Sequence, residues 1–552
     1  MKHSYLLLVL LSFSVILPET LVAGVFDEAV SGGDDSSVDV GTSATAENGD
    51  GADENTDAGT SDSSGAMDMP PSSAGTGSGL NFDFNGYIRG DVFVGKMPEY
   101  SRGELKNGYG ELSLKLQVSK SRYGSAFGEV RFKGGYLKDS HYLGEPSDTA
   151  PTGEDRLQMG GSVQLREAYV DWYLGRLEFR LGQQIVLWGR ADGINPTNNI
   201  TPVDMRVRSP EEDDRRMANI GLRVKLDLSP VRFEGIWMPV YSPSVMPQVK
   251  LASALIFDEP DYPDFDLANG LVAGKIHLVF PAIEMSVSYL NGYSLTPGIV
   301  YAGNNFSDAY YEAPDPEFAM FVETPDTKTV TLMRKAYRHQ VVGFDFSTTL
   351  GSFMGLRGEL AFRFPEAQNE AAEDRYYIPN PDLYYVLGAD KEFGNLMVVA
   401  QYVGRYTFDW KEHPIYNEDH EDFFNSLVNE PDLNNLDEAA SWEMRETLVN
   451  YMATTELVKT NRMIHGQSAE IQHGVSLRLS WSVLHEALKF IAFGMANFTT
   501  QEFLIYPKVQ YMVTDDMTVT AGAEIYIGPD DTLFGMIDET LTAGYAELKV
   551  SF

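Results

Sequence analysis

The chain is dominated by short segments in which apolar and polar residues alternate, and this pattern runs from residue 82 to the C-terminus. The clearest example is residues 111–118, where Leu112, Leu114, Leu116 and Val118 are separated by polar residues. Successive side chains of a β-strand point to opposite faces, so each segment predicts a strand with one apolar and one polar face. Repetition of the pattern over most of the 552 residues predicts an all-β protein.

The connections between these segments indicate which all-β fold is present. We expect strands near residues 82–95, 108–120, 123–137, 163–174, 176–189, 217–229, 230–240, 270–281, 282–292, 338–350, 353–365, 382–393, 394–406, 467–482, 485–499, 502–513, 516–528 and 540–552. Turns of a few residues alternate with long loops, which are expected to be extracellular and to lie at 138–162, 190–216, 241–269, 293–337 and 407–466. A β-sandwich has loops of mixed length at both ends, whereas an outer-membrane barrel has short periplasmic turns and long outer loops. The pattern therefore predicts a transmembrane antiparallel β-barrel of about 18 strands (16 to 18) over residues 81–552.

Two segments precede the predicted barrel. Residues 1–24 begin with Lys2, continue with an apolar run shorter than a membrane-spanning helix requires, and end in small residues, which is typical of a secretory signal peptide. Residues 25–80 contain twelve acidic residues, no lysine or arginine, and many Gly, Ser and Thr residues. This composition buries too little apolar surface to fold, so we expect a disordered acidic periplasmic linker, and a periplasmic protein is the candidate partner for it.

The composition excludes several classes of function. The chain contains no cysteine, so it cannot form disulfides, Cys-ligated zinc sites or iron–sulfur clusters. Its 80 acidic and 42 basic residues give a net charge of -38, which is unsuited to binding nucleic acid. The sequence has no nucleophile elbow, phosphate-binding loop or His-Glu-x-x-His zinc motif. We therefore predict neither an enzyme nor a cofactor, with a barrel enzyme kept as an alternative.

The last predicted strand alternates up to the final residue of the chain. Leu548, Val550 and Phe552 share its apolar face. An amphipathic last strand that ends in phenylalanine resembles the assembly signal of outer-membrane barrels. This resemblance implies that the barrel-assembly machinery is a partner.

One region of the predicted barrel resembles a known family. Its residues are Leu165-Arg166-Glu167-Ala168-Tyr169-Val170-Asp171-Trp172-Tyr173-Leu174, Arg180 to Arg190 with Trp188-Gly189-Arg190 at the end, Asn195-Pro196 and Pro202-Val203-Asp204. They resemble a porin-like outer-membrane family that is catalogued as a domain of unknown function and is related in architecture to alginate-export and phosphate-selective porins. The resemblance implies an envelope pore but no particular substrate. The acidic segment 25–80 and the length of the loop at 407–466 depart from the family pattern.

Charged and polar residues on the polar faces of the predicted strands are the candidate pore lining. A charge that faces lipid is costly, so these side chains are expected to face the lumen. The candidates are Lys115, Arg131, Lys133, Glu167, Asp171, Glu178, Arg180, Gln184, Arg223, Lys225, Arg357, Glu359 and Arg363. They form either a charged constriction that selects solutes or ion pairs that fill the barrel wall. The loop at 190–216 either folds into the mouth of the barrel or stays on its surface.

The predicted outer loops are acidic. Residues 409–465 contain thirteen acidic and four basic residues, and another loop contains Asp258, Asp261, Asp264 and Asp266. Acidic loops concentrate cations and can bind the divalent ions that bridge lipopolysaccharide. The four aspartates are weak candidates for calcium ligands, because their spacing lacks the central glycine of a dedicated calcium loop.

The sequence as a whole predicts a porin-like channel in the cell outer membrane. We expect passive or substrate-biased diffusion of small hydrophilic solutes, with anions favoured because the predicted wall is mixed to basic. Outer-membrane lipid and lipopolysaccharide are the expected surroundings of the barrel. Two other classes stay open: a barrel sheath around a protein or electron conduit or export complex, and a surface adhesin that binds through the acidic 407–466 loop.

Overall fold

The computed structural model describes residues 80–96, 103–120, 123–137, 158–245, 255–304, 330–351, 353–366, 372–411, 454–529 and 532–552. The wall strands are β1 (Asn81–Lys96), β2 (Gly103–Lys120), β3 (Gly124–Leu137), β4 (Gln158–Leu174), β5 (Leu177–Gln184), β6 (Asn219–Leu228), β7 (Val231–Met238), β9 (Leu271–Val279), β10 (Ile283–Tyr293), β13 (Arg338–Leu350), β14 (Met354–Pro365), β15 (Asp382–Phe393), β16 (Leu396–Thr407), β17 (Ile471–Val483), β18 (Leu488–Asn497), β19 (Glu502–Thr514), β20 (Met517–Ile527) and β21 (Ala543–Ser551). The signal peptide and the acidic linker predicted at 1–24 and 25–80 lie outside the described residues, except for Leu80.

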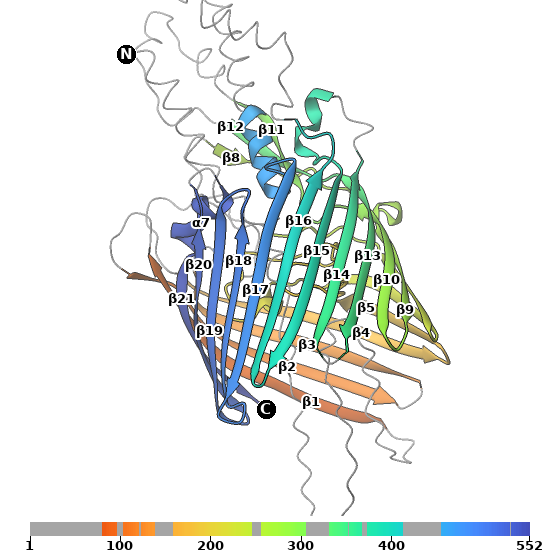
Figure 1. Cartoon of the computed structure of the whole chain (residues 1–552), viewed down its shortest axis with the longest axis vertical. Coiled ribbons are helices and arrows are strands. Elements are labelled where there is room, and N and C mark those ends of the chain that lie inside the picture. The colour runs from red at the N-terminus through yellow and green to blue at the C-terminus, as the bar shows by residue number, and fades with distance from the viewer. Residues whose placement is uncertain are drawn as a thin grey trace, which may run out of the picture.

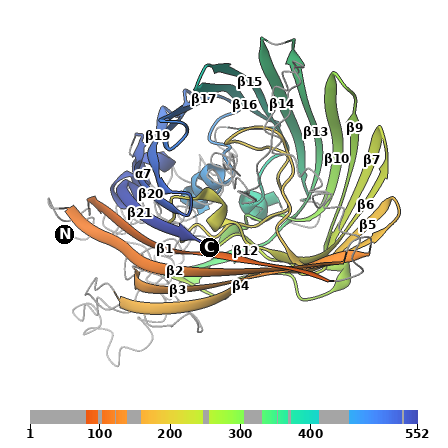
Figure 2. The same cartoon turned by 90° about the horizontal axis from the view of Figure 1, so that it is seen from below.

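These eighteen strands form one closed antiparallel sheet (Figure 1). Each strand pairs with the next along the wall, and β1 pairs with both β2 and β21, so the last strand meets the first. Seen from below, the strands form a ring (Figure 2). The predicted antiparallel barrel of about eighteen strands is confirmed.

The outer face of the barrel is apolar and the inner face is largely polar. On β1, Ile88 and Val92 are 56% and 45% exposed, whereas Arg89 and Asp91, which lie between them, are almost completely buried. The same alternation places exposed Val170 beside buried Asp171 on β4. A closed sheet satisfies all its backbone hydrogen bonds internally, and an apolar exterior is the form that a bilayer accepts. The chain is therefore a transmembrane β-barrel of the outer-membrane type.

The barrel wall is uneven in height. Strands β1 to β4 contain 16, 18, 14 and 17 residues. The strands β5, β6, β7 and β9 contain only 8, 10, 8 and 9 residues. The wall is therefore low on the side where β5 and β6 are joined by a long connection.

The long connections carry additional elements at one end of the barrel. A small sheet contains β8 (Leu255–Phe257), β11 (Gly298–Asn304) and β12 (Val330–Lys335), with β8 parallel to β12. These strands arise from the loops predicted at 241–269 and 293–337, and residues 454–464 of the loop predicted at 407–466 form a helix. Figure 1 shows this sheet beyond the upper ends of the wall strands. The loop predicted at 138–162 ends earlier than expected, because β4 already begins at Gln158.

A short helix precedes the last strand. The helix α7 (Leu533–Leu541) follows β20, and the side chain of Thr532 caps its first turn by accepting a hydrogen bond from the backbone of Gly535. The last strand therefore begins at Ala543, slightly later than predicted. None of the helices in the described ranges has the length and apolar character that crossing a bilayer requires.

The C-terminal residue lies against the first strand. The backbone groups of Phe552 and Gly86 exchange two hydrogen bonds, of 2.9 and 3.0 Å. The ring of Phe552 lies over Gly86, and its centroid is 6.4 Å from that of Phe84. Leu548, Val550 and Phe552 are all exposed on the outer face of the barrel, and their role as an assembly signal stays a prediction.

Replacing Gly86 with alanine is expected to destabilise the barrel where β1 pairs with β2 and meets the C-terminal residue. A Cβ at this position would collide with the carbonyl oxygen of Ser113 and lie 3.0 Å from the Cζ atom of Phe552. Overpacking of this kind typically costs about 1–3 kcal/mol, so the variant should unfold at lower temperature when followed by heat-dependent gel migration. Gly90→Ala is the matched control on the same strand, because a Cβ there meets no atom within 4 Å. Equal melting of the two variants would contradict the prediction.

Candidate functional site: the lumen loop

The connection between β5 and β6 runs through the inside of the barrel. We call residues 185–218 the lumen loop, residues 185–200 its outgoing limb and residues 201–218 its returning limb. It makes contacts with strands on all sides of the wall, as described below, and Figure 2 shows it within the ring of strands. The connection expected at 190–216 thus begins earlier, because β5 ends at Gln184, and of the two courses expected for it the structure has the one that enters the barrel.

A sharp turn at Gly189 directs the chain across the lumen. Gly189 has a φ of 113°, which L-residues with a side chain rarely adopt. A Cβ at this position would also collide with the side chain of Asn195. The Trp188-Gly189-Arg190 and Asn195-Pro196 pieces of the recognised sequence region therefore shape one compact turn of the lumen loop.

Arg190 fastens the outgoing limb of the lumen loop to the far wall. Its Nε atom lies 2.8 Å from a carboxylate oxygen of Asp345 on β13, and its Nη1 atom lies 2.7 Å from Glu284 on β10. Asp345 also lies 2.9 Å from Lys275 on β9. The side chains of Arg190 and Asp345 are 6% and 1% exposed, so this pair is shielded from solvent, whereas Glu284 is 33% exposed.

Glu359 on β14 is a second anchor for the outgoing limb. Its carboxylate is 3% exposed and accepts hydrogen bonds from the backbone N–H groups of Arg190 and Ala191. It also accepts a hydrogen bond of 3.0 Å from the hydroxyl of Thr197. A buried carboxylate that is satisfied largely by the main chain of one loop fixes the path of that loop.

Asp214 ties the returning limb of the lumen loop to the opposite side of the barrel. Its carboxylate lies 2.6 Å from Arg89 on β1 and 2.5 Å from Arg131 on β3. Burial by itself would raise the pKa of Asp214, but these two cations outweigh that effect and hold the pKa well below its usual range. Asp214 is therefore charged at all physiological pH values.

Two further arginines of the returning limb meet Glu524 on β20. Arg208 and Arg215 lie 2.8 and 3.0 Å from its two carboxylate oxygens. Arg208 also donates a hydrogen bond of 2.6 Å to the backbone carbonyl of Leu541. That carbonyl lies at the C-terminal end of α7, where a cation is electrostatically favoured.

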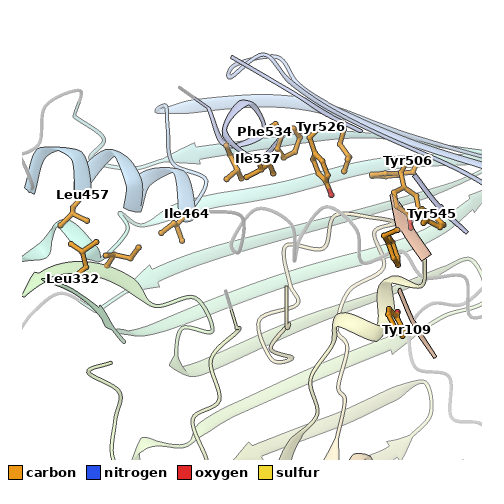
Figure 3. Packing of buried hydrophobic residues seen from close by; sticks show 14 of the residues in the cluster. Tyr109, Leu332, Leu457, Ile464, Tyr506, Tyr526, Phe534, Ile537 and Tyr545 are labelled. Atoms are coloured by element: carbon orange, nitrogen blue, oxygen red, sulfur yellow. The ribbon is translucent and has the colours of Figure 1, made fainter. Parts of the chain in front are cut away.

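An apolar cluster joins α7, the outer elements and the wall. Its members, many of them shown in Figure 3, include Leu332 of β12, Leu457 and Ile464 of the helix at 454–464, Phe534 and Ile537 of α7, and Tyr506, Tyr526 and Tyr545 of the wall. Met205 of the lumen loop packs against this cluster. The cluster and the ion pairs together hold the returning limb.

Most of the predicted pore-lining residues are held in pairs. The ion pairs are Asp171–Arg180 at 2.7 Å, Glu178–Lys225 at 3.6 Å, Arg223–Glu234 at 2.8 Å, Arg357–Asp390 at 2.6 Å, Arg363–Asp382 at 2.5 Å, Lys133–Glu111 at 3.1 Å and Arg131–Asp214 at 2.5 Å. Glu167 and Glu359 accept hydrogen bonds from the main chain of the lumen loop, and Gln184 donates one to the carbonyl of Gly221. Lys115 forms no ion pair with any described residue. Their part in solute passage stays a prediction.

Several residues that hold the lumen loop were not among the predicted candidates. Arg89 lies on the polar face of a predicted strand, so the alternation could have identified it. Arg166 lies at a break in the alternation. Positions on one face of a regular strand are two residues apart, but the outward-facing positions Leu165 and Ala168 are three apart. Asp214 left no local signal, since its partner Arg89 is far away in the sequence.

The candidate calcium ligands do not come together. In the described ranges, no group of three or more His, Asp or Glu side chains is arranged to hold a metal ion. The Asp266 side chain caps a short helix turn at residues 267–269, and Asp261 lies 4.0 Å from Lys335.

A family model matches part of the chain. Residues 5–249 match the family model described as "Protein of unknown function (DUF1302)", a range that includes the resemblance at 165–210 and the whole lumen loop. No curated protein matches the chain.

Three of the solved structures that resemble the chain are the following. The outer membrane protein opdK from Pseudomonas aeruginosa is 9% identical, with 86% of this chain and 98% of that chain covered and a TM-score of 0.44. A BenF-like porin from Pseudomonas fluorescens Pf-5 is 8% identical, with coverages of 86% and 98% and a TM-score of 0.42. OccAB4 from Acinetobacter baumannii is 10% identical, with coverages of 86% and 97% and a TM-score of 0.46. The strand pairing and the apolar exterior make this chain an eighteen-stranded β-barrel of the outer-membrane type, and its residues 5–249 match the DUF1302 family model of unknown function.

Proposed function

We propose that the chain is a porin-like channel whose passage is narrowed by the lumen loop, and that it admits small hydrophilic solutes with a preference for anions. The observation that carries this proposal is the course of the lumen loop, which crosses the barrel between Glu359 on one wall and Arg89 on the other. Its charged contacts to surrounding strands would make a constriction of fixed shape within a closed wall. Porins select solutes by the size and charge of such a constriction.

The preference for anions is supported by three lysines near the ends of β2, β18 and β21 that adjoin the short turns. Lys115, Lys489 and Lys549 share the inner faces of these strands with buried residues of the lumen, and none of them forms an ion pair with a described residue. Two carboxylates lie beside them on the same faces, Glu129 opposite Lys115 and Glu547 two residues before Lys549, and arginines already compensate both: Arg131 lies 2.5 Å from Glu129 and Arg89 lies 3.5 Å from Glu547. Ammonium groups without an ion-pair partner, next to carboxylates that arginines already compensate, would raise the local concentration of anions.

Planar-bilayer recording on the refolded full-length chain tests the proposal. We expect stepwise increases in current and, in a salt gradient, a reversal potential that indicates preference for chloride over potassium. A folded barrel that gives no current steps at any voltage would overturn the channel function. A cation-selective reversal potential would overturn the anion preference alone.

The selectivity of the channel is expected to depend on pH through Glu212 in the lumen loop. Burial raises the pKa of Glu212 to about 8, although Arg478, Lys508 and Arg215 act in the opposite direction. The carboxyl group is therefore mostly neutral at pH 6.5 and mostly negative at pH 9, so anion preference should decrease over this range. Reversal potentials of the wild type and of Glu212→Gln at both values check this, since the variant should lack this part of the change. Identical pH responses of the two proteins would contradict the assignment.

A further inference from the structure

The strand β4 contains one residue more than its partner β3 requires. Glu129 is opposite Glu167 and Val130 is opposite Leu165, so Arg166 has no partner on β3. In a regular strand, neighbouring side chains point to opposite faces, and one of Arg166 and Glu167 would face lipid. The extra residue of a β-bulge changes this, and both side chains reach the inside of the barrel, where Arg166 is 4% exposed.

Arg166 holds the returning limb of the lumen loop by its main chain. Its guanidinium donates hydrogen bonds to the backbone carbonyls of Asp213 and Arg216, and a longer one of 3.4 Å to that of Asp214. The side chains of the same residues are engaged elsewhere, since Asp214 pairs with Arg89 and Asp213 pairs with Arg216. Arg166 therefore fixes the position of the backbone, independently of the charges that this limb presents.

Glu167 holds the outgoing limb at the point where the chain leaves the wall. Its carboxylate accepts a hydrogen bond of 2.7 Å from the backbone N–H of Ile185, the first residue after β5. Consecutive side chains of one bulge thus contact the beginning and the end of the lumen loop.

We propose that this bulge is the clamp that positions the lumen loop, and that Arg166 is the positioning residue that sets the geometry of the constriction. The consequence for solute passage rests on the proposed channel function, whereas the position of the loop does not. A planar guanidinium with several fixed donors can serve three carbonyls at once, which a lysine ammonium cannot do in the same geometry. The charge of Arg166 is therefore not sufficient for its role.

The test measures the loop directly with a spin label. The chain has no cysteine, so Val207→Cys introduces a single labelling site on the returning limb. In this background we compare Arg166→Lys and Arg166→Met with the unchanged clamp. The matched control is Arg232→Met. Arg232 lies 3.1 Å from Asp227 within the β6–β7 hairpin, so this substitution removes an ion pair in which neither the clamp nor the lumen loop takes part. Heat-dependent gel migration confirms that each labelled protein is a folded barrel.

We expect the mobile component of the spin-label spectrum to increase in both Arg166 variants and to stay unchanged in the control. If Arg166→Met fails to fold, Arg166→Lys alone decides the question, because it keeps the charge and loses the fork of donors. A spectrum of Arg166→Lys equal to that of the unchanged clamp would overturn the proposal. In bilayers, the Arg166→Lys protein should also show an altered reversal potential and noisier current. Absence of current in the wild type would overturn the channel function. The spin-label result would then still show whether Arg166 positions the lumen loop.

Discussion

Replacing Glu359 with alanine is expected to raise the single-channel conductance and the noise of the open channel. The substitution removes the acceptor for the backbone N–H groups of Arg190 and Ala191 and for the hydroxyl of Thr197. Each buried donor left without an acceptor costs about 1–3 kcal/mol, so the outgoing limb should move away from β14 to a position where water hydrates these donors. Recording of single channels at fixed voltage measures the change.

Two variants define what the Glu359 result means. Glu359→Gln keeps one acceptor oxygen and should give a conductance between those of the wild type and Glu359→Ala. Glu366→Ala removes a carboxylate just after the same strand, where it accepts a hydrogen bond of 3.1 Å from exposed Gln340, and should behave as the wild type does. A folded Glu359→Ala barrel with unchanged conductance would show that this anchor does not hold the loop.

Arg89→Met is expected to destabilise the whole barrel. Arg89 is 2% exposed and contacts both carboxylate oxygens of Glu111 at 3.0 Å, and Asp214 at 2.6 Å. Removal of one partner from a buried ion pair typically costs roughly 3–5 kcal/mol, because the remaining charge is left without compensation. The urea concentration at the midpoint of unfolding, followed by tryptophan fluorescence in lipid vesicles, should decrease clearly.

A second substitution tests whether the Arg89 effect is electrostatic. Asp214→Asn neutralises one of the carboxylates that Arg89 compensates, so the double variant should recover part of the lost stability. Residues that share one network are expected to be non-additive in this way. Strictly additive losses would instead point to packing of the arginine side chain as the source.

The sequence was sufficient to locate every wall strand, because alternation reports directly which face of a strand is apolar. The eighteen predicted segments correspond one to one with β1 to β7, β9, β10 and β13 to β21. The limits of strands were less well determined. For example, the alternation around Leu187 continues beyond Gln184, where β5 actually leaves the sheet.

The course of the lumen loop could not be derived from the sequence, since its contacts are between distant residues. Arg190 and Glu359 are 169 positions apart, and nothing near either of them indicates the other. The family resemblance did include Arg166, Glu167, Gly189 and Arg190, and these residues share one task in the structure: they direct or fasten the lumen loop. The residues that carry the family resemblance are thus largely the ones that hold the lumen loop.

The low side of the wall has a consequence for the surrounding lipid. The eight residues of β5 extend about 26 Å along the strand, and a tilt of about 40° reduces this to a height of about 20 Å. The apolar band of outer-membrane barrels is roughly 25 Å tall, so the acyl chains beside β5 to β9 meet a shorter hydrophobic surface than those beside β1 to β4. A bilayer adapts to such hydrophobic mismatch by local thinning or by tilt of the protein. This barrel should therefore sit inclined in the outer membrane, with the thinnest lipid next to the point where its lumen loop begins.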